Sequence, residues 1–139
     1  MIREGNMRGP KMLGRKIVIV DDDESIRKTF FLLLARKYRV YLAADGEEAL
    51  ARFRNAGVDL IIADYRLPRA SGLELIEEFR RSGYRGDVIM VSAFPDLIRL
   101  EDLQRLSISQ FFVKPLDLNV FNRSIDALLE IRDAMERRA

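Results

Sequence analysis

Five short apolar segments alternate with longer segments of helical spacing, and this alternation constrains the fold more than any other feature of the sequence. The apolar segments are rich in β-branched and aromatic residues and cover residues 16–20, 38–44, 59–63, 87–93 and 110–113. Several are apolar at consecutive positions, which is typical of strands covered on both faces. The helical segments cover residues 25–36, 46–55, 72–81, 96–106 and 117–137. This (βα)5 order predicts an α/β fold with a parallel five-stranded sheet and helices on both faces.

Length and charge distribution indicate one domain after a basic extension. With 139 residues and 48% hydrophobic content, the chain is long enough for one compact core. Residues 1–16 carry five basic side chains and one acid, so the rest of the chain has a net charge of about −2. We expect a flexible basic extension over residues 1–14 and a single domain over residues 15–137. Because no aromatic residue lies between the charges of the extension, we expect no direct binding to nucleic acid.

Two absent residue types limit the chemistry. Without cysteine, neither a disulfide framework nor a zinc-thiolate site can form. Without histidine, the usual catalytic base and the commonest metal ligand are both missing, so any bound metal must take oxygen ligands. The longest uninterrupted apolar stretch, residues 30–35, is too short to span a membrane. We therefore expect a cytoplasmic protein without membrane association.

Charged and hydroxyl groups follow four of the five predicted strands. Residues 21–24 are all acidic and follow the first strand, while Asp64, Ser92 and Lys114 follow the third, fourth and fifth. In open parallel sheets, ligands bind beyond the carboxyl ends of the strands. Carboxylates gathered there can bind Mg²⁺, and a carboxylate beside that ion can attack phosphorus while the ion, an ammonium and a hydroxyl stabilise charge. Asp64 is the best placed nucleophile because it stands alone after its apolar segment.

Each of these residues also has an ordinary structural interpretation. Asp23, Glu24 and Ser25 precede a predicted helix, where acids and serine are common as caps. Asp64 could belong to a turn, and Lys114 could be a surface lysine. If all of these interpretations were correct, complementary groups would lie at four strand ends of one sheet only by coincidence. The joint pattern therefore favours a functional site.

As a set, four segments resemble the receiver domains of bacterial two-component response regulators, of the chemotaxis-regulator type. These segments are VIVDDDESIR, DLIIADYRLPRASG, VIMVSA and FFVKP, and the resemblance covers about residues 15–135. It implies a flavodoxin-like fold with strand order 2-1-3-4-5. It also implies that a sensor histidine kinase or a phosphotransfer protein phosphorylates the chain, which then acts as a signalling phosphoacceptor and not as an enzyme.

The resemblance implies a Mg²⁺ site beside the phosphoacceptor. Asp64 looks like the phosphoacceptor, and Asp22 looks like the direct metal ligand. Asp21 would act mainly through water, and the backbone carbonyl of Arg66 would complete the protein's share of the metal shell. Asp23 matches no metal ligand in the family pattern, so we interpret it as a helix-capping acid.

The resemblance also implies switch residues. Ser92 looks like the hydroxyl that moves to the phosphoryl group, and Lys114 looks like the ammonium that pairs with that group. Phe111 stands where an aromatic switch residue, often tyrosine, turns inward. The Lys-Pro bond at this place is usually cis, which predicts a cis bond between Lys114 and Pro115. Phe94 flanks the site, and we hypothesise that it restricts water and lengthens the lifetime of the phosphoryl group.

The predicted fourth helix carries more apolar residues than one buried stripe requires. They are Leu97, Ile98, Leu100, Leu103 and Leu106. All five could lie in the core. Alternatively, the fourth helix, fifth strand and fifth helix form a face for a homodimer or an output partner. Just after this helix, Ser107-Ile108 stands where receivers often have a Gly-Ala pair.

Two other functions are alternatives to the phosphoacceptor. The segment VIVDDDES also resembles the first motif of haloacid-dehalogenase-type phosphatases, with Asp21 as nucleophile and Asp23 as acid/base. That fold needs a further acidic pair after Lys114 to hold Mg²⁺. The aspartates beyond that lysine lie in or near an amphipathic helix: Asp117, Asp126 and Asp133. The second alternative is a pseudo-receiver, an interaction module that works without phosphorylation and need not bind Mg²⁺.

Overall fold

The structure, a computed structural model, describes residues 14–138 and has the predicted (βα)5 order. The strands are β1 (Lys16–Val20), β2 (Arg39–Ala43), β3 (Leu60–Asp64), β4 (Asp87–Ser92) and β5 (Gln110–Val113). They form one parallel sheet in the order β2-β1-β3-β4-β5, so the expected strand order is confirmed. The predicted extension over residues 1–14 lies outside the described residues, apart from Gly14.

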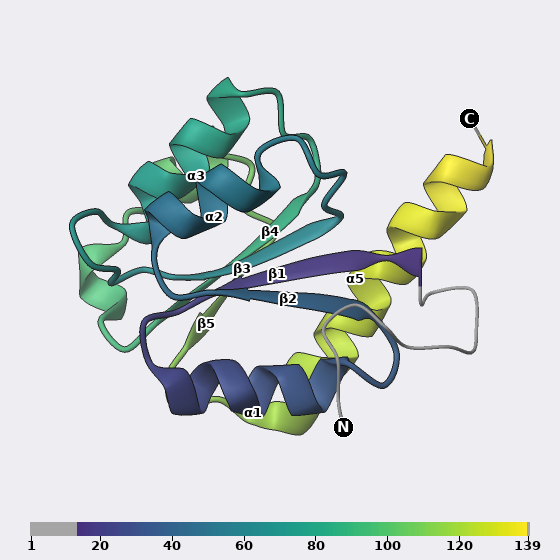
Figure 1. The fold of residues 1–139 in the computed structure, drawn as a ribbon, viewed down its shortest axis with the longest axis horizontal. Coiled ribbons are helices and arrows are strands. Elements are labelled where there is room, and N and C mark those ends of the chain that lie inside the picture. The colour runs from purple at the N-terminus through teal and green to yellow at the C-terminus, as the bar shows by residue number, and fades with distance from the viewer. Residues whose placement is uncertain (1–13, 139) are drawn as a thin grey trace.

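Helices cover both faces of the sheet (Figure 1). On one face lie α1 (Glu24–Leu34) and α5 (Leu118–Arg138). On the other face lie α2 (Gly46–Phe53), α3 (Gly72–Arg81) and the short α4 (Leu100–Arg105). Within residues 14–138, no helix has the length and apolar character needed to cross a membrane.

Two apolar clusters, one on each face, fix the strands in place. Side chains alternate along a strand, so Ile17 and Ile19 of β1 enter the cluster with α1 and α5, while Val18 and Val20 enter the cluster with α2 and α3. All five residues of β3 are buried. The carboxyl ends of β1 and β3 are therefore held side by side by core packing, and the residues that follow them inherit fixed positions.

The predicted fourth helix over residues 96–106 is wrong in its first half. Residues Pro95–Leu97 form a single 3₁₀ turn, and α4 begins only at Leu100. Ile98 interrupts the helix because its backbone is extended, with φ −107° and ψ 127°, and its side chain packs against the cluster beneath α3. Of the five apolar residues predicted on this helix, Leu106 is buried, whereas Leu97 and Leu100 are exposed. The alternative that all five lie in the core is therefore wrong.

The loop after α4 turns through Ser107, which has a positive φ of 54°. Left-handed geometry at a helix end favours glycine, the residue that receivers often carry here. Arg80 holds this turn, because its guanidinium donates to the carbonyl oxygens of Leu106 at 2.9 Å and of Ser107 at 3.0 Å. A side chain from α3 thus supports the unusual backbone of Ser107.

Candidate functional site

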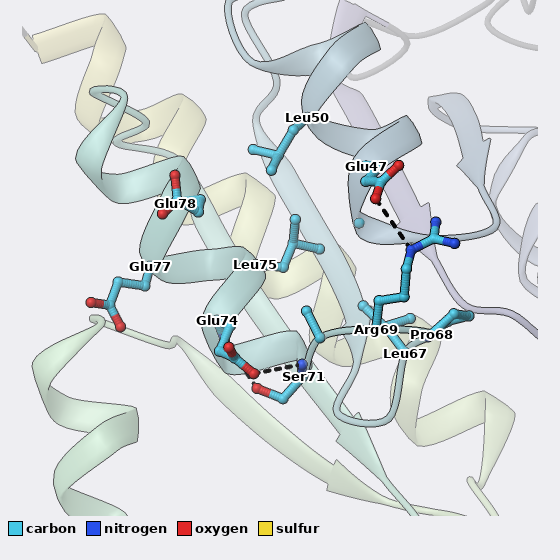
Figure 2. A pocket seen from close by; sticks show the side chains of 12 residues that line it. Glu47, Leu50, Leu67, Pro68, Arg69, Ser71, Glu74, Leu75, Glu77 and Glu78 are labelled. Atoms are coloured by element: carbon cyan, nitrogen blue, oxygen red, sulfur yellow. Dashed lines mark hydrogen bonds and ion pairs between the residues drawn. The ribbon is translucent and has the colours of Figure 1, made fainter.

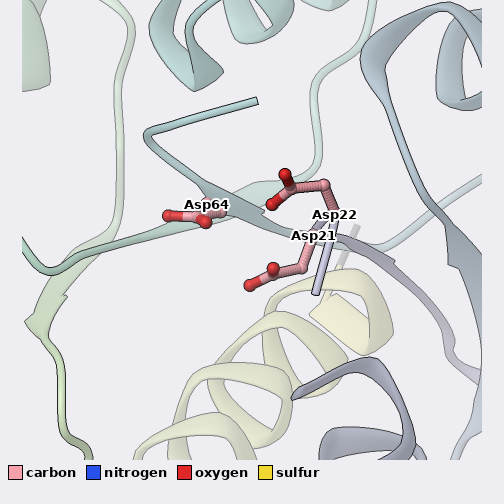
Figure 3. Close-up of side chains that lie close together, drawn as sticks. All are labelled: Asp21, Asp22 and Asp64. Carbon is pink, nitrogen blue, oxygen red and sulfur yellow. The ribbon is translucent and has the colours of Figure 1, made fainter. Parts of the chain in front are cut away.

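Three carboxylates meet at the carboxyl edge of the sheet. Asp21 and Asp22 follow β1, and Asp64 is the last residue of the neighbouring β3. Each offers one carboxylate oxygen, and these oxygens all lie within 4.8 Å of one another (Figure 3). The structure therefore brings together the three side chains that the sequence predicted for a metal site.

The cluster is buried at its base and open on one side. Asp21 is 2% exposed and Asp64 is 9% exposed, whereas Asp22 lies at the surface. An Asp21 carboxylate oxygen accepts the backbone N–H of Asp23 at 2.9 Å, which fixes its orientation. Arg27 donates to the Asp21 backbone carbonyl at 2.6 Å and holds the start of the loop. The cluster therefore faces solvent through Asp22, while Asp21 and Asp64 are held in place beneath the surface.

Lys114 balances part of this negative charge. Its Nζ lies 3.1 Å from Oδ2 of Asp21 and 3.2 Å from Oδ2 of Asp64. Burial alone would lower the pKa of Lys114, but the two carboxylates raise it overall, so the ammonium stays charged. Burial raises the pKa of Asp21, and the charge of Asp64 adds to that rise. The two buried carboxylates of Asp21 and Asp64 thus share the ammonium of Lys114.

The acids next to the cluster have a different role. The Asp23 side chain accepts the backbone N–H groups of Ser25 and Ile26 at the start of α1, so its predicted capping role is confirmed. The Ser25 hydroxyl is the main cause of the lowered pKa of Asp23. Glu24, in the first turn of α1, pairs with Lys28 at 3.1 Å.

Two loop residues meet beside the carboxylates. Phe94 is 45% exposed, and the guanidinium of Arg66 lies 4.6 Å from the centre of its ring. Arg66 comes two residues after Asp64 and Phe94 two residues after Ser92, at the ends of adjacent strands. This equal offset is the signal that could have predicted the contact, which sequence reasoning missed. The Ser92 hydroxyl is buried and accepts the backbone N–H of Phe94 at 2.8 Å.

The remaining predicted switch elements lie along and after β5. Phe111 is half-buried and packs against the cluster on the α2 and α3 side of the sheet. The bond between Lys114 and Pro115 is cis, as predicted. The structure gives the position of Phe111, while its switching role stays a prediction.

Gly72 is a site-supporting residue that sequence reasoning missed. It is the first residue of α3, and a Cβ added there would lie 2.3 Å from the backbone oxygen of Asp64. Its N–H donates to the carbonyl of Tyr65 at 2.7 Å. The helix therefore approaches the backbone of Asp64 more closely than any other residue type would allow.

The donor set fits a hard divalent cation. All candidate ligands are oxygens, namely the side chains of Asp21, Asp22 and Asp64. Mg²⁺ prefers oxygen and usually takes one or two carboxylates together with water and phosphate oxygens. Asp22 lies at the surface, so water can supply further oxygen ligands on its side of the cluster.

The chain matches a known family over most of its length. The family model described as "Response regulator receiver domain" matches residues 17–126. The chain is 32% identical to the Regulator of RpoS of Escherichia coli K12 over 122 residues, which is 85% of this chain and 36% of that protein. It thus spans about a third of that relative's length. It is 28% identical to the Sporulation initiation phosphotransferase F of Bacillus subtilis, with 91% of this chain and 94% of that protein covered.

Solved structures agree with this match. The N-terminal domain of an uncharacterized Wolinella succinogenes protein has a TM-score of 0.80 and 28% identity, covering 88% of this chain and 99% of that one. The Thermotoga maritima response regulator TrrA has a TM-score of 0.71 and 28% identity, covering 83% of this chain and 99% of that one. That protein was crystallised in complex with Mg²⁺ and BeF.

Proposed function

Because the chain belongs to the family of response regulator receiver domains, we propose that it accepts a phosphoryl group on Asp64 in two-component signalling. The donor is the phosphohistidine of a sensor histidine kinase or a phosphotransfer protein. The observation that supports this proposal most directly is the meeting of Asp21, Asp22 and Asp64 within 4.8 Å. We further propose that residues 15–137 act as one domain and that the transfer takes place in the cytoplasm.

The transfer is a displacement at phosphorus. An oxygen of the Asp64 carboxylate forms the new P–O bond while the P–N bond of the donor phosphohistidine breaks. The electron pair of the broken bond stays on the imidazole nitrogen of the donor, which takes a proton from water. Lys114 already lies 3.2 Å from the Asp64 carboxylate, so its ammonium can pair with an oxygen of the transferred group.

Mg²⁺ fits beside Asp64 in this proposal. The side chains of Asp21 and Asp22 and the backbone carbonyl of Arg66 would hold it, as the family resemblance implies. When bound, Mg²⁺ supplies positive charge that offsets the negative charge gathering on the phosphoryl oxygens. The chain's own contribution is to hold Asp21 and Asp64 in place before any ligand arrives, since both side chains are buried and bonded.

Phosphorylation would be signalled through β4 and the loop after it. A phosphoryl group adds strong hydrogen-bond acceptors, and the Ser92 hydroxyl still has its own hydrogen to donate. We propose that Ser92 moves toward the phosphoryl group and that Phe111 turns inward. The face made of α4, β5 and α5 then contacts a second copy or an output partner. One exposed apolar residue from each of these elements, Leu100, Val113 and Leu118, supports this choice of surface.

The experiment that tests this function is intact-protein mass spectrometry after incubation with acetyl phosphate, with and without Mg²⁺. We expect one phosphoryl adduct that requires Mg²⁺ in the native chain and is absent in Asp64→Asn. The control variant is Asp102→Asn, since Asp102 is an aspartate of α4 that pairs with Arg105 away from the carboxylate cluster. This variant should be phosphorylated like the native chain.

Two other outcomes of the mass-spectrometry experiment would favour the pseudo-receiver or the phosphatase. A folded native chain that never gains an adduct would favour the pseudo-receiver. An adduct that persists in Asp64→Asn and disappears in Asp21→Asn would favour the phosphatase. Against the phosphatase, two of the aspartates beyond Lys114 have other partners: Asp117 accepts backbone N–H groups at the start of α5, and Asp133 pairs with Arg15.

Phe94 provides a second test, on the lifetime of the phosphoryl group. Its ring stacks with Arg66 beside Asp64, so we expect the pair to hinder attacking water. In Phe94→Ala the half-life of the phosphorylated protein should fall several-fold, measured by loss of the adduct after the donor is removed. Leu97→Ala is the control, because Leu97 is an exposed apolar residue of the same segment. Equal half-lives in native protein and Phe94→Ala would contradict the hypothesis.

A further inference from the structure

A groove between α2 and α3 plays no part in the proposed phosphoryl chemistry (Figure 2). Its volume is about 400 Å³. Leu50 of α2 and Leu75 of α3 line it from its two sides, and Leu67 and Pro68 of the loop after β3 close one end. Such a lining suits an aliphatic side chain, whose burial removes apolar surface from water.

The rim of this groove is predominantly acidic. One guanidinium, that of Arg69, lines the groove together with four carboxylates: Glu47, Glu74, Glu77 and Glu78. Arg69 pairs with Glu47 at 3.2 Å, and Arg81 pairs with Glu77 and Glu78. Glu77 also pairs with Arg105 of α4 at 3.4 Å, so the four carboxylates meet three guanidiniums and are still in excess. A positively charged ligand therefore meets a complementary potential here, and an acidic ligand is repelled.

The groove is preformed, because its end wall is a constrained loop. Arg69 has a positive φ of 69°, and Arg66 and Ser71 form a β-bridge across the loop. Ser71 also begins α3 with a capping box, in which Glu74 and Ser71 each accept a backbone N–H of the other. A ligand would not have to order this wall, which lowers the entropic cost of binding.

We propose that this groove binds a peptide segment of a partner protein in which an aliphatic side chain stands between lysine or arginine residues. The aliphatic side chain enters between Leu50 and Leu75, and the flanking cations pair with the carboxylates of the rim. None of the residues that line the groove belongs to α4, β5 or α5, so this contact is distinct from the α4, β5 and α5 face. It requires neither Mg²⁺ nor phosphorylation of Asp64.

The test is an NMR titration of the ¹⁵N-labelled full chain with three synthetic peptides of equal length, without Mg²⁺ or phosphodonor. The first peptide is acetyl-Gly-Lys-Leu-Arg-Gly-amide; the second has Glu in place of Lys and Arg, and the third has Ser in place of Leu. We expect saturable shifts of the amides of Gly46, Leu50 and Ala70 with the first peptide alone. Running the same titration on Asp64→Asn separates this result from the fate of the phosphoacceptor proposal.

A pair of matched variants sharpens the test. Glu47 and Glu101 are 78% and 76% exposed, and each pairs with one arginine, but only Glu47 lines the groove. Glu47→Gln should weaken binding of the first peptide about threefold, the effect of losing one surface ion pair, while Glu101→Gln should leave it unchanged. Equal weakening in both variants, shifts centred on another surface, or equal binding of all three peptides would overturn the proposal.

Discussion

The two ends of the sheet carry the same types of charged residue and differ in how those charges are satisfied. At the amino end, Arg15 pairs with Asp59, Asp133 and Glu136 at 3.1, 2.9 and 2.9 Å. At the carboxyl end, Lys114 pairs with Asp21 at 3.1 Å. It also pairs with Asp64 at 3.2 Å. Asp59 immediately precedes β3 and Asp64 ends it, so one strand connects both clusters.

The difference lies in which charge is buried. At the amino end the guanidinium is enclosed, and further arginines reach its carboxylates: Arg137 pairs with Asp133, and Arg132 pairs with Glu136. At the carboxyl end the carboxylates are enclosed. Burial lowers the pKa of Arg15, but its three partners raise it overall, so folding favours that charge. The raised pKa of Asp21 means that folding disfavours its charge. The ion pairs of the amino end therefore stabilise the folded chain, whereas the ionised Asp21 of the carboxyl end lowers its stability.

The largest expected effect concerns backbone packing at the carboxyl end. Gly72→Ala puts a Cβ 2.3 Å from the Asp64 carbonyl, so the backbone must shift. We expect a loss of about 3 kcal/mol in the free energy of unfolding, measured by urea denaturation, together with slower phosphorylation. Gly46→Ala is the matched control, because Gly46 begins α2 as Gly72 begins α3 and its Cβ would make an ordinary 3.4 Å contact with Leu75. Similar losses in both variants would show that close approach to Asp64 is not the cause.

Arg15→Met should remove the ion pairs that Arg15 forms at the amino end of the sheet. It leaves three carboxylates without the guanidinium that they share, and we expect a loss of about 2 kcal/mol in the free energy of unfolding. Phosphorylation of the remaining folded protein should be unchanged. Arg137→Met is the control, since Arg137 pairs with Asp133 at the surface at 3.6 Å. If Arg15→Met were as stable as the native chain, the ion pairs at the amino end would not stabilise the fold, and the two ends would not differ in this respect.

Smaller effects are expected on the melting temperature when Asp21 and Asp59 are each replaced by asparagine, and the two shifts should have opposite signs. Without Mg²⁺ at pH 7, Asp21→Asn should raise the melting temperature, because the ionised form of Asp21 is disfavoured in the folded chain. Asp59→Asn should lower it, because Arg15 loses a partner. The penalty from Asp21 exists only while it is ionised, so the gain should shrink as the pH falls toward the ordinary pKa of 3.8. Calorimetry in EDTA measures the melting temperatures of both variants. Shifts of equal sign would contradict the proposed difference between the two ends of the sheet.

Much of the fold was predictable because apolar periodicity is local information. The predicted segments 16–20 and 110–113 coincide with β1 and β5, and 72–81 coincides with α3. The position of the site was predictable as well, since parallel strands bring residues such as Asp21 and Asp64 to one edge.

Contacts between distant residues were not predictable from periodicity. Arg15 was counted among the basic residues near the N-terminus, yet it is largely enclosed by Asp59, just before β3, and by acids of α5. Nothing in the sequence adjacent to Arg15 indicates those partners. The early part of the fourth helix was mispredicted because core packing of Ile98 overrides its helical spacing. The need for glycine at position 72 depends on the path of the backbone at Asp64, which only the folded chain defines.

The segment before α4, residues 93–97, can open locally while the rest of the domain stays folded. Residues 93–97 are all exposed, and no side chain caps the N-terminus of α4 at Arg99. Few buried contacts would be lost if this segment rearranged, whereas β4 beneath it is fully enclosed over residues 88–92. Amide hydrogens of the segment should therefore exchange with solvent long before those of β4. Under the proposed function, the contacts of one phosphoryl group on Asp64 would then shift this loop between arrangements without unfolding the sheet.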